Sequence, residues 1–567
     1  MGLKIKINSV VYGVYAVGLM ATTMIPNPGF ANVSLKNGDF FVGYTDIIYP
    51  GGFDPKIERV YNSKSPFKGI FGWGWGNEFE EYISVSADGS VVVHEYGGGA
   101  ENRFSPVAFN QAELNKAADM IAGAAQKAGL VGNVGQLESY KNHLKTSADF
   151  RNEEWEKFRA QGKLQPRTLL NNTQLHSNRF SYQYVTKVPN GYVRSFDNGK
   201  VEKYDELGKL VRISDKNGNF IDLTYGKDGH LQKIVDNFNR KIFFDFNTQG
   251  LLAKLEGENG KKAEYTYNSK GELIASRDVE GNVYKYEYDT ASRHNLEKIS
   301  YADNKAMVMS YYGRDKHENI KSVKDRDGTL TEYTYTNDPA DKGHYGAAVL
   351  VKRADGAQIS SSKYEYLIKK KADGEDWTYK MVTVLDGDRT ETTYNECCGL
   401  PLVIKHGSEE TTFEYDTKGH VTKKITPYEV TQLHYDEAAA KVDRVTKYPK
   451  KDAKKAVWSQ FQYDAKANLI FAKNSEGKGV KILYDRSGRI STLVDQDHRQ
   501  ISFKYNENSK PVEISDPSLG TIKVSYANSG EIKNVESTAG RKIALQVTSA
   551  FQNLLEIIRP AGVTLSF

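Results

Sequence analysis

Apolar and polar residues alternate through most of the second half of the chain, and the pattern recurs at a fixed interval. An aromatic residue, most often Tyr, returns every 21 positions from Tyr204 to Tyr288, and the same step runs again from Tyr463 to Val547. A repeat of fixed length indicates a structural unit that stacks on copies of itself. The aromatic positions that we expect in the repeat core are Tyr225, Phe246, Tyr267, Tyr288, Tyr415, Tyr484, Tyr505 and Tyr526.

Each unit predicts two short β-strands and two turns. Ile221, Leu223 and Tyr225 alternate with polar residues, which is the period of a strand with one buried face. Asn, Asp and Gly cluster in the turns because they adopt positive φ at low steric cost. One unit cannot bury its own apolar face, so the units must form one long antiparallel sheet that twists into a spiral shell or solenoid. The alternation leaves open whether the enclosed face is a filled core or lines a cavity.

Residues 105–178 interrupt this pattern with a segment rich in Ala, Lys, Glu and Gln. Asn110 and Glu113 have the spacing of an N-cap and its N3 partner, and they precede a predicted amphipathic helix. A second helix is expected over residues 135–162, with Trp155 and Phe158 among its apolar positions. The segment is either an insertion that packs against the sheet or closes one end, or a plug or partner-docking surface. We favour the packed insertion.

The first 31 residues have the pattern of a signal peptide. Lys4 and Lys6 form a basic region, and an apolar run follows over residues 10–24. Small residues before the bond between Ala31 and Asn32 predict cleavage there. The apolar run is shorter than the roughly 20 residues that a membrane-spanning helix needs. We therefore expect an exported protein that is secreted, on the cell surface or periplasmic, with no transmembrane segment in the mature chain.

Composition narrows the function classes. The 567 residues include 77 Lys or Arg and 72 Asp or Glu, so the net charge of +5 does not predict a nucleic-acid-binding surface. Tyr supplies 36 residues and Pro only 15, which argues against disorder over most of the chain. A mean hydropathy of -0.60 argues against a helical membrane bundle. We find no sequence motif for a catalytic, cofactor-binding or metal-binding site.

The only two cysteines, Cys397 and Cys398, are adjacent. Two residues exclude a disulfide-stapled scaffold and a multi-cysteine zinc site. Adjacent α-carbons lie about 3.8 Å apart across a trans peptide, which is below the usual disulfide range. The sequence leaves two alternatives for these cysteines: a strained vicinal disulfide or two free thiols in a turn.

Two sets of motifs resemble one protein family. The units Tyr-Asp-x-x-Gly-x-Leu, as from Tyr204 to Leu210, resemble the YD repeats of RHS-type proteins, which include bacterial polymorphic toxins, toxin-complex shells and teneurins. Residues 59–65 and 71–75 are similar to the small β-domain that precedes the repeats in bacterial members. The resemblance implies a large β-shell around a hollow interior, which often encloses a C-terminal toxin released by self-cleavage.

This resemblance divides the chain into four parts. They are a signal peptide (1–31), an N-terminal RHS-associated β-domain (32–104), the helical insertion (105–178) and a YD-repeat β-shell (179–567). Self-cleaving members end their shell in an Asp-Pro-x-Gly-Leu motif, whereas residues 516–520 read Asp-Pro-Ser-Leu-Gly inside an ordinary repeat. We therefore expect neither an autoprotease motif nor a toxin domain in this sequence.

Two hypotheses for function follow. The first is a non-enzymatic exported shell that encloses or presents another polypeptide, either a cargo or a second shell component, in a toxin-delivery type of system. The alternative is a cell-surface adhesin or carbohydrate-binding protein, because Tyr-rich sheets offer aromatic faces and polar edges that suit a surface glycan. Neither hypothesis requires a cofactor.

Overall fold

The computed structural model describes residues 30–537, apart from short segments at 50–52, 54, 96–99, 107–109, 166, 178–182, 292, 338–340, 342, 398, 507–509, 518–519 and 527–531. The predicted signal peptide before residue 30, Cys398 and the last repeat around Val547 lie outside the described residues. The predicted fold class, a mostly-β chain with one long antiparallel repeat sheet, an N-terminal β-domain and a helical insertion, is confirmed.

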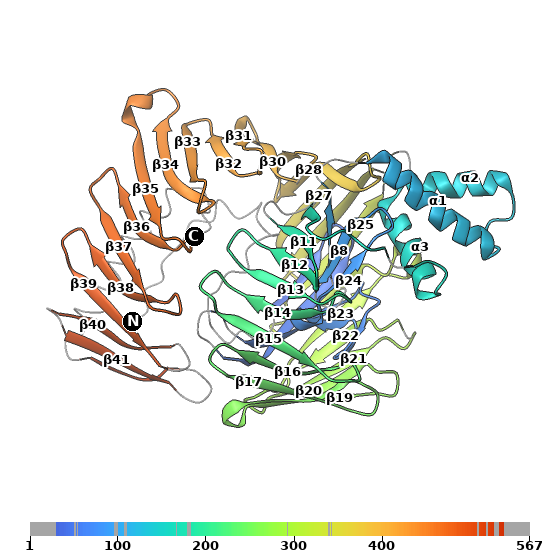
Figure 1. Cartoon of the computed structure of the whole chain (residues 1–567), viewed down its shortest axis with the longest axis horizontal. Helices are drawn as coiled ribbons and strands as arrows, with labels where there is room; N and C mark the ends of the chain where they lie inside the picture. Colours follow the sequence, from blue (N-terminus) through green and yellow to red (C-terminus); the bar gives the residue numbers. More distant parts are fainter. Residues whose placement is uncertain are drawn as a thin grey trace.

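One antiparallel sheet of 36 strands, β7–β42, curves through the molecule (Figure 1). Each strand pairs with the next one along the chain, and β9 pairs with β10 across the helical insertion. Within the described residues no ladder joins β42 to β7, so the sheet is open. We divide it into a first wall (β7–β24), a middle wall (β25–β32) and a C-terminal wall (β33–β42).

The first wall begins before the helical insertion. Its strands β7–β9 fall in the range that the sequence assigns to the N-terminal β-domain, yet they belong to the long sheet. The strands are β7 (Tyr82–Val85), β8 (Val91–Glu95), β9 (Ala100–Ser105), β10 (Gln174–Ser177), β11 (Tyr184–Val188), β12 (Gly191–Ser195), β13 (Val201–Tyr204), β14 (Leu210–Ser214), β15 (Phe220–Tyr225), β16 (Leu231–Asp236), β17 (Lys241–Phe246), β18 (Leu252–Gly257), β19 (Lys262–Tyr267), β20 (Leu273–Arg277), β21 (Val283–Tyr288), β22 (Leu296–Ser300), β23 (Ala306–Tyr311) and β24 (Ile320–Lys324).

The other two walls continue the same hairpin order. The middle wall comprises β25 (Leu330–Asn337), β26 (His344–Lys352), β27 (Gln358–Lys370), β28 (Asp376–Leu385), β29 (Asp388–Tyr394), β30 (Pro401–His406), β31 (Glu409–Tyr415) and β32 (Val421–Ile425). The C-terminal wall comprises β33 (Glu429–Asp436), β34 (Lys441–Pro449), β35 (Val457–Tyr463), β36 (Leu469–Asn474), β37 (Gly479–Tyr484), β38 (Ile490–Asp495), β39 (Gln500–Tyr505), β40 (Pro511–Asp516), β41 (Gly520–Tyr526) and β42 (Ile532–Ser537).

The repeat motif explains both the turn and the curvature. Asp205 caps the turn after β13, since its Oδ1 accepts hydrogen bonds from the N–H groups of Leu207 (2.9 Å) and Lys209 (2.8 Å). Gly208 has φ of 83°, a conformation that favours glycine. The ladder shifts by one residue next to the motif Tyr, as at Tyr225. A β-bulge bends its strand and increases the local twist, so one bulge in each repeat promotes the curling of the sheet.

A second, smaller sheet lies against the inner face of the first wall. Its strands run in the order β1 (Phe30–Ser34), β2 (Asp39–Ile48), β3 (Lys56–Asn62) and β6 (Trp75–Asn77), and β4 (Lys68–Gly69) pairs with β5 (Gly72–Trp73). We call the four-stranded sheet the N-terminal sheet. Figure 1 shows it in blue between the green and yellow strands of the first wall. The predicted cleavage site lies inside β1, where Ala31 pairs with Val42 and Asn32 with Phe41, so cleavage there would shorten β1 to three residues.

Three helices form the insertion: α1 (Gln111–Lys127), α2 (Val134–Thr146) and α3 (Ala148–Ala160). Asn110 caps α1 as predicted. The single helix expected over residues 135–162 is divided, because Ser147 ends α2 and its Oγ accepts the Phe150 N–H at the start of α3 (3.3 Å). Single 3-10 turns occur at η1 (Glu78–Glu80), η2 (Glu258–Gly260), η3 (Arg314–Lys316) and η4 (Ala453–Lys455).

The insertion packs on its own small core and joins two distant parts of the sheet. Trp155 Nε1 donates to the backbone oxygen of Val85 in β7 (2.9 Å). Arg151 is fully buried and donates to the backbone oxygen of Asp373, in the turn before β28 (2.9 Å). The helices therefore connect the start of the first wall to the middle wall.

Candidate functional site

The inner face of the middle wall is the candidate functional surface. Tyr333 and Tyr335 of β25 pack against the core that the N-terminal sheet shares with the first wall, so their face of the sheet is the inner one. In β27, Tyr364 and Tyr366 are half-buried and alternate with exposed polar residues. Buried residues form three hydrophobic cores in the described part of the chain. None of the buried residues that form these cores lies on the middle wall. This face therefore keeps the alternation of the repeats without being covered as the first wall is.

Three hydrogen-bond donors on this wall have no acceptor within the described part of the chain. Tyr335 Oη and Tyr345 Oη lie on the inner face, whereas Trp377 Nε1 lies on the outer face, where Trp377 pairs with Lys369; each of the three atoms is buried. The Tyr345 ring stacks on Tyr366, with centroids 4.8 Å apart and an interplanar angle of 9°. Burial raises the pKa of Tyr366 to about 12, so the phenol stays neutral and can donate. Buried donors normally have partners, and a cluster without them points to a missing acceptor.

The tyrosines of the regular repeats differ in this respect. Tyr484 Oη donates to the backbone oxygen of Leu469 (2.8 Å), and Tyr505 Oη donates in the same way to Ile490 (2.7 Å). Each bond ties the end of one strand to the start of the strand before it. We call this series the tyrosine ladder. Its further members are the bonds Tyr225 to Leu210, Tyr267 to Leu252, Tyr311 to Leu296, Tyr415 to Pro401, Tyr435 to Val421, Tyr463 to Val442 and Tyr526 to Pro511.

Sequence reasoning explained these tyrosines by burial alone and missed the hydroxyl contact. The expected repeat-core residues lie at strand ends and are half-buried, while the fully buried positions come two and four residues earlier, as with Ile221 and Leu223. The signal that could have revealed the ladder is the preference for Tyr over Phe at the end of the alternating run. Ladder hydroxyls are engaged inside the sheet, which weakens the case for an aromatic sugar-binding face.

A buried ion pair fixes the N-terminal sheet on the first wall. Arg59 Nε lies 2.8 Å from Asp46 Oδ2, and both side chains are buried. Arg59 Nη2 donates to Tyr286 Oη (2.9 Å) and Ser276 Oγ (3.0 Å), and Tyr265 Oη donates to Asp46 (2.7 Å). Burial acts to lower the pKa of Arg59, but the Asp46 carboxylate raises it well above its ordinary value. The N-terminal sheet is thus bonded to β19, β20 and β21 in one defined position.

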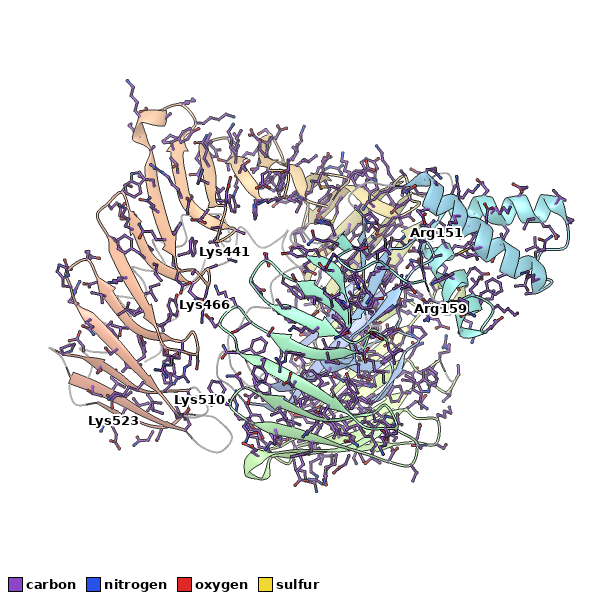
Figure 2. The ribbon with its side chains drawn as sticks, viewed as in Figure 1. Arg151, Arg159, Lys441, Lys466, Lys510 and Lys523 are labelled. Carbon is purple, nitrogen blue, oxygen red and sulfur yellow. The ribbon has the colours of Figure 1, made fainter. Side chains whose placement is uncertain are left out.

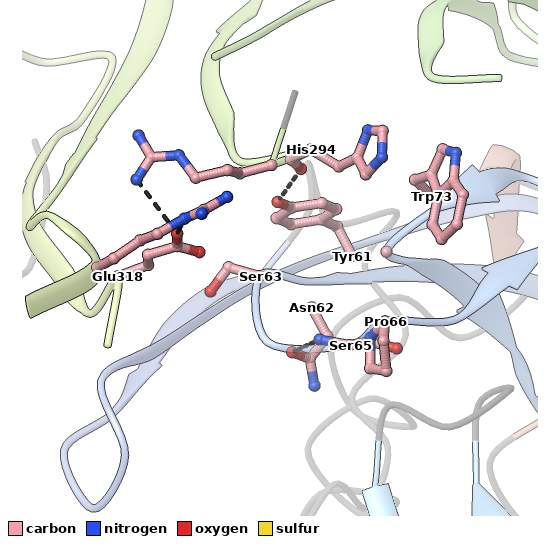
Figure 3. A pocket seen from close by; sticks show the side chains of 11 residues that line it. Tyr61, Asn62, Ser63, Ser65, Pro66, Trp73, His294 and Glu318 are labelled. Carbon is pink, nitrogen blue, oxygen red and sulfur yellow. Dashed lines mark hydrogen bonds and ion pairs between the residues drawn. The ribbon is translucent and has the colours of Figure 1, made fainter. Parts of the chain in front are cut away.

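A cavity of about 440 Å³ lies where the N-terminal sheet meets the turns of the first wall (Figure 3). Trp73 stacks on His294 with ring centroids 4.5 Å apart, and Tyr61 Oη donates to the His294 backbone oxygen (2.8 Å). Arg293 pairs with Asp289 (2.7 Å) and with Glu318 (3.3 Å). These charged and aromatic groups are already paired with one another, so the cavity is a polar junction rather than a prepared ligand site.

The two cysteines are the remaining residues that the sequence singled out, and the structure gives them no functional role. Cys397 lies in the turn after β29, and the vicinal disulfide stays a prediction because Cys398 is outside the described residues. The sequence predicts no catalytic, cofactor or metal site. Across the described ranges, no three His, Cys, Asp or Glu side chains gather as metal ligands, and no helix combines the length and apolar character needed to cross a membrane.

Two families match separate parts of the chain. A domain of unknown function (DUF6531) matches residues 31–104, and the Teneurin YD-shell matches residues 443–567. The second match covers strands that carry the 21-residue repeat and the tyrosine ladder. Residues 443–567 are YD-repeat sequence. The resemblance stated from the sequence is confirmed, and the long open sheet is a YD-shell. No curated protein matches the YD-repeat chain significantly.

Solved structures of toxin complexes are similar to this YD-repeat protein at low identity. The Tc holotoxin pore of Photorhabdus luminescens is 11% identical, with a TM-score of 0.42, over 88% of this chain and 27% of that one. The TcdB2-TccC3-TEV structure is 12% identical, with a TM-score of 0.43, over 91% of this chain and 28% of that one. TcdB2-TccC3 is 12% identical, with a TM-score of 0.39, over 88% and 30%. The chain spans less than a third of these proteins.

Proposed function

We propose that this YD-repeat protein is an exported, non-enzymatic shell component that encloses or presents another polypeptide. The observation that supports this most is the inner face of the middle wall. It continues the aromatic alternation of the repeats, yet its tyrosines are half-buried and two of its buried donors, Tyr335 Oη and Tyr345 Oη, lack acceptors among the described residues. Backbone oxygens of a polypeptide would supply those acceptors, and its apolar side chains would cover the aromatic rings.

The rest of the architecture is consistent with a scaffold. The first wall is already filled by the N-terminal sheet, and the ion pair of Arg59 with Asp46 holds that sheet in place. The middle wall is the part of the inner surface left for a partner. Toxin delivery is the system in which we place such a shell, and secretion follows from the predicted signal peptide.

Site-specific photo-crosslinking tests the proposal. Benzoyl-phenylalanine is placed either at Tyr366, on the inner face of β27, or at its neighbour Glu365, which is exposed on the opposite face. Both variants are produced in the natural host and irradiated before purification. We expect one defined polypeptide to be crosslinked from position 366 and not from position 365.

Two outcomes of the crosslinking experiment would contradict the proposal. If neither position yields a crosslinked polypeptide, and native mass spectrometry finds only the lone chain in the same preparation, the shell does not house a partner. Crosslinking from both positions at equal yield would show that contact does not depend on the inner face, and it would also contradict the proposal.

A further inference from the structure

A serine, a histidine and a glutamate form a connected row on the first three strands of the long sheet. Ser84 Oγ lies 2.8 Å from His94 Nε2, and His94 Nδ1 lies 3.1 Å from Glu101 Oε1. The three residues come from the consecutive strands β7, β8 and β9, and His94 pairs directly with Glu101 in the ladder. We call these three side chains the Ser-His-Glu row.

The row lies on the outer face of the sheet, opposite the core. Ile83 and Val93 are buried in the core that the first wall shares with the N-terminal sheet. Ser84 and His94 are the next residues along the same two strands, and successive side chains of a strand point to opposite faces. The row is therefore separate from the inner face on which we place a partner polypeptide.

The charge of Glu101 determines where the protons of the row lie. The hydrogen bond from His94 lowers the pKa of Glu101, so the carboxylate is ionised and can only accept. His94 Nδ1 then carries the proton of the neutral ring, which leaves a lone pair on Nε2. Ser84 Oγ donates its hydroxyl proton to that lone pair. In this arrangement the ring can take the proton as the serine oxygen becomes a nucleophile.

The histidine ring is held in place and shielded. Tyr82, its partner in the ladder, stacks on it with ring centroids 4.2 Å apart and an interplanar angle of 10°. His94 is 9% exposed, whereas Ser84 is half-buried and the Glu101 side chain is 61% exposed. The base is thus fixed in one orientation, while one end of the row is open to solvent.

The helical insertion borders the row. Trp155 Nε1 of α3 donates to the backbone oxygen of Val85, the residue after Ser84. Figure 2 shows Arg151 and Arg159 of the same helix where the insertion meets the sheet. Because the carboxylate end of the row stays exposed, the insertion lies beside the row without burying it.

Two other histidines make one contact of this kind each. His294 Nδ1 lies 2.8 Å from Glu272 Oε1, and His406 Nδ1 lies 3.1 Å from Thr390 Oγ1. His94 has a hydroxyl on one ring nitrogen and a carboxylate on the other. Activation of a hydroxyl needs both contacts, since the second group orients the base that acts on the first.

We propose that Ser84 is a nucleophilic modification site that takes an acyl group from an activated ester or thioester. Ser84 Oγ bonds to the carbonyl carbon while its proton passes to His94 Nε2. The bond from that carbon to the leaving oxygen or sulfur breaks, and the leaving group takes the proton from His94 and departs as an alcohol or thiol. The product is an ester on Ser84. Glu101 is a positioning residue, because it holds the ring in the tautomer that accepts the proton.

This site goes beyond the shell role and does not depend on it. The reaction modifies the chain once and requires no turnover of a substrate. A failure to acylate Ser84 would leave the crosslinking result at Tyr366 unchanged, and the reverse also holds.

The small activated ester p-nitrophenyl acetate tests the site on the purified full-length protein. We expect acetylation of Ser84, which peptide mass spectrometry locates and times. His94→Gln should slow this acetylation by about a hundredfold or more, since loss of a general base typically costs that much. Ser310 is the internal control, because it is half-buried like Ser84 but its Oγ contacts the Ser322 hydroxyl (2.7 Å). Ser310 should stay unmodified over the same time.

Variants of the exposed Glu101 keep the test valid if His94→Gln fails to fold. Glu101→Gln should slow acetylation of Ser84 by at least about tenfold at an unchanged Tm. Glu101→Asp keeps the carboxylate and should recover part of the rate, which a merely structural role would not predict. No acetyl group on Ser84, equal acetylation of Ser84 and Ser310, or wild-type rates in Glu101→Gln would overturn the proposal.

Discussion

The first wall and the middle wall are built from the same alternating strands, but their inner faces differ in what covers them. On the first wall the N-terminal sheet buries the inward side chains, so that Tyr286 is 3% exposed and Ile234 and Leu255 are 0% exposed. On the middle wall the equivalent aromatic side chains are half-buried, and buried donors there lack acceptors among the described residues. The alternation determines which face of the sheet is apolar, whereas a separate element, the N-terminal sheet, determines whether that face is covered.

The difference also assigns different roles to the same residue type. Tyr286 on the first wall donates or accepts within a network of Arg59 and Ser276, and ladder tyrosines such as Tyr484 bond to the backbone. Tyr366 on the middle wall packs on a neighbouring ring. The first two uses stabilise the chain itself, while the third leaves a surface on which a partner can pack.

The largest expected effect comes from deleting a buried aromatic of the first wall. Tyr286→Ala opens a cavity in the covered core and removes a partner of Arg59, and it should cost about 4–5 kcal/mol of unfolding free energy. Lys285→Ala, one position away on the exposed face, should stay within about 0.5 kcal/mol. Denaturant unfolding measures both, and equal losses would mean that the assignment of inner and outer faces is wrong.

A slightly smaller effect is expected at the ion pair that holds the N-terminal sheet. Arg59→Met leaves Asp46 buried without its cation and should cost about 3–4 kcal/mol. The double variant Arg59→Met/Asp46→Leu removes both charges and should recover a large part of that loss. Chemical denaturation of the two proteins decides the matter. A double variant that is no more stable than Arg59→Met would contradict the explanation that the loss comes from the buried Asp46 carboxylate without its cation.

The matching deletion on the middle wall should be milder. Tyr366→Ala removes a half-buried ring that stacks on Tyr345, and we expect a loss of about 1–2 kcal/mol in the protein alone. Glu365→Ala is the control on the opposite face. A loss at Tyr366 as large as that at Tyr286, in the same unfolding assay, would remove the contrast between the two walls.

The smallest effect concerns one bond of the tyrosine ladder. Tyr484→Phe keeps the ring and deletes the hydroxyl that binds the Leu469 backbone oxygen, which should cost about 0.5–1.5 kcal/mol. Tyr428→Phe, at a side chain that is 70% exposed, should change the Tm far less. Thermal melts of both variants compare them, and identical shifts would mean that the ladder bond adds nothing to stability.

The local parts of this architecture could be predicted from the sequence, and the distant contacts could not. The period of two at Ile221 and Leu223 and the Asp-x-x-Gly turns specify strands and hairpins, because both depend on neighbouring residues. The Asn110 cap is local in the same sense, while the break at Ser147 was missed because Ser also occurs inside helices. The pairing of Asn217 with Asn468 joins positions 251 residues apart. No periodicity encodes such contacts.

The candidate site was harder to predict for the same physical reason. Tyr364 and Tyr366 alternate with polar residues just as Tyr265 and Tyr286 do, so the pattern along the chain does not distinguish the two pairs. Only the position of the N-terminal sheet, fixed by Arg59, separates the covered tyrosines from the uncovered ones.

Hydroxyl-radical footprinting with mass spectrometry tests the central claim, that the inner face of the middle wall receives a partner polypeptide. The recombinant chain alone is compared with the protein isolated from its natural host. We predict that Tyr364 and Tyr366 are modified in the chain alone and protected in the host preparation, while Tyr286 is protected and Tyr428 modified in both. Equal modification of Tyr364 and Tyr366 in the two preparations would contradict the account.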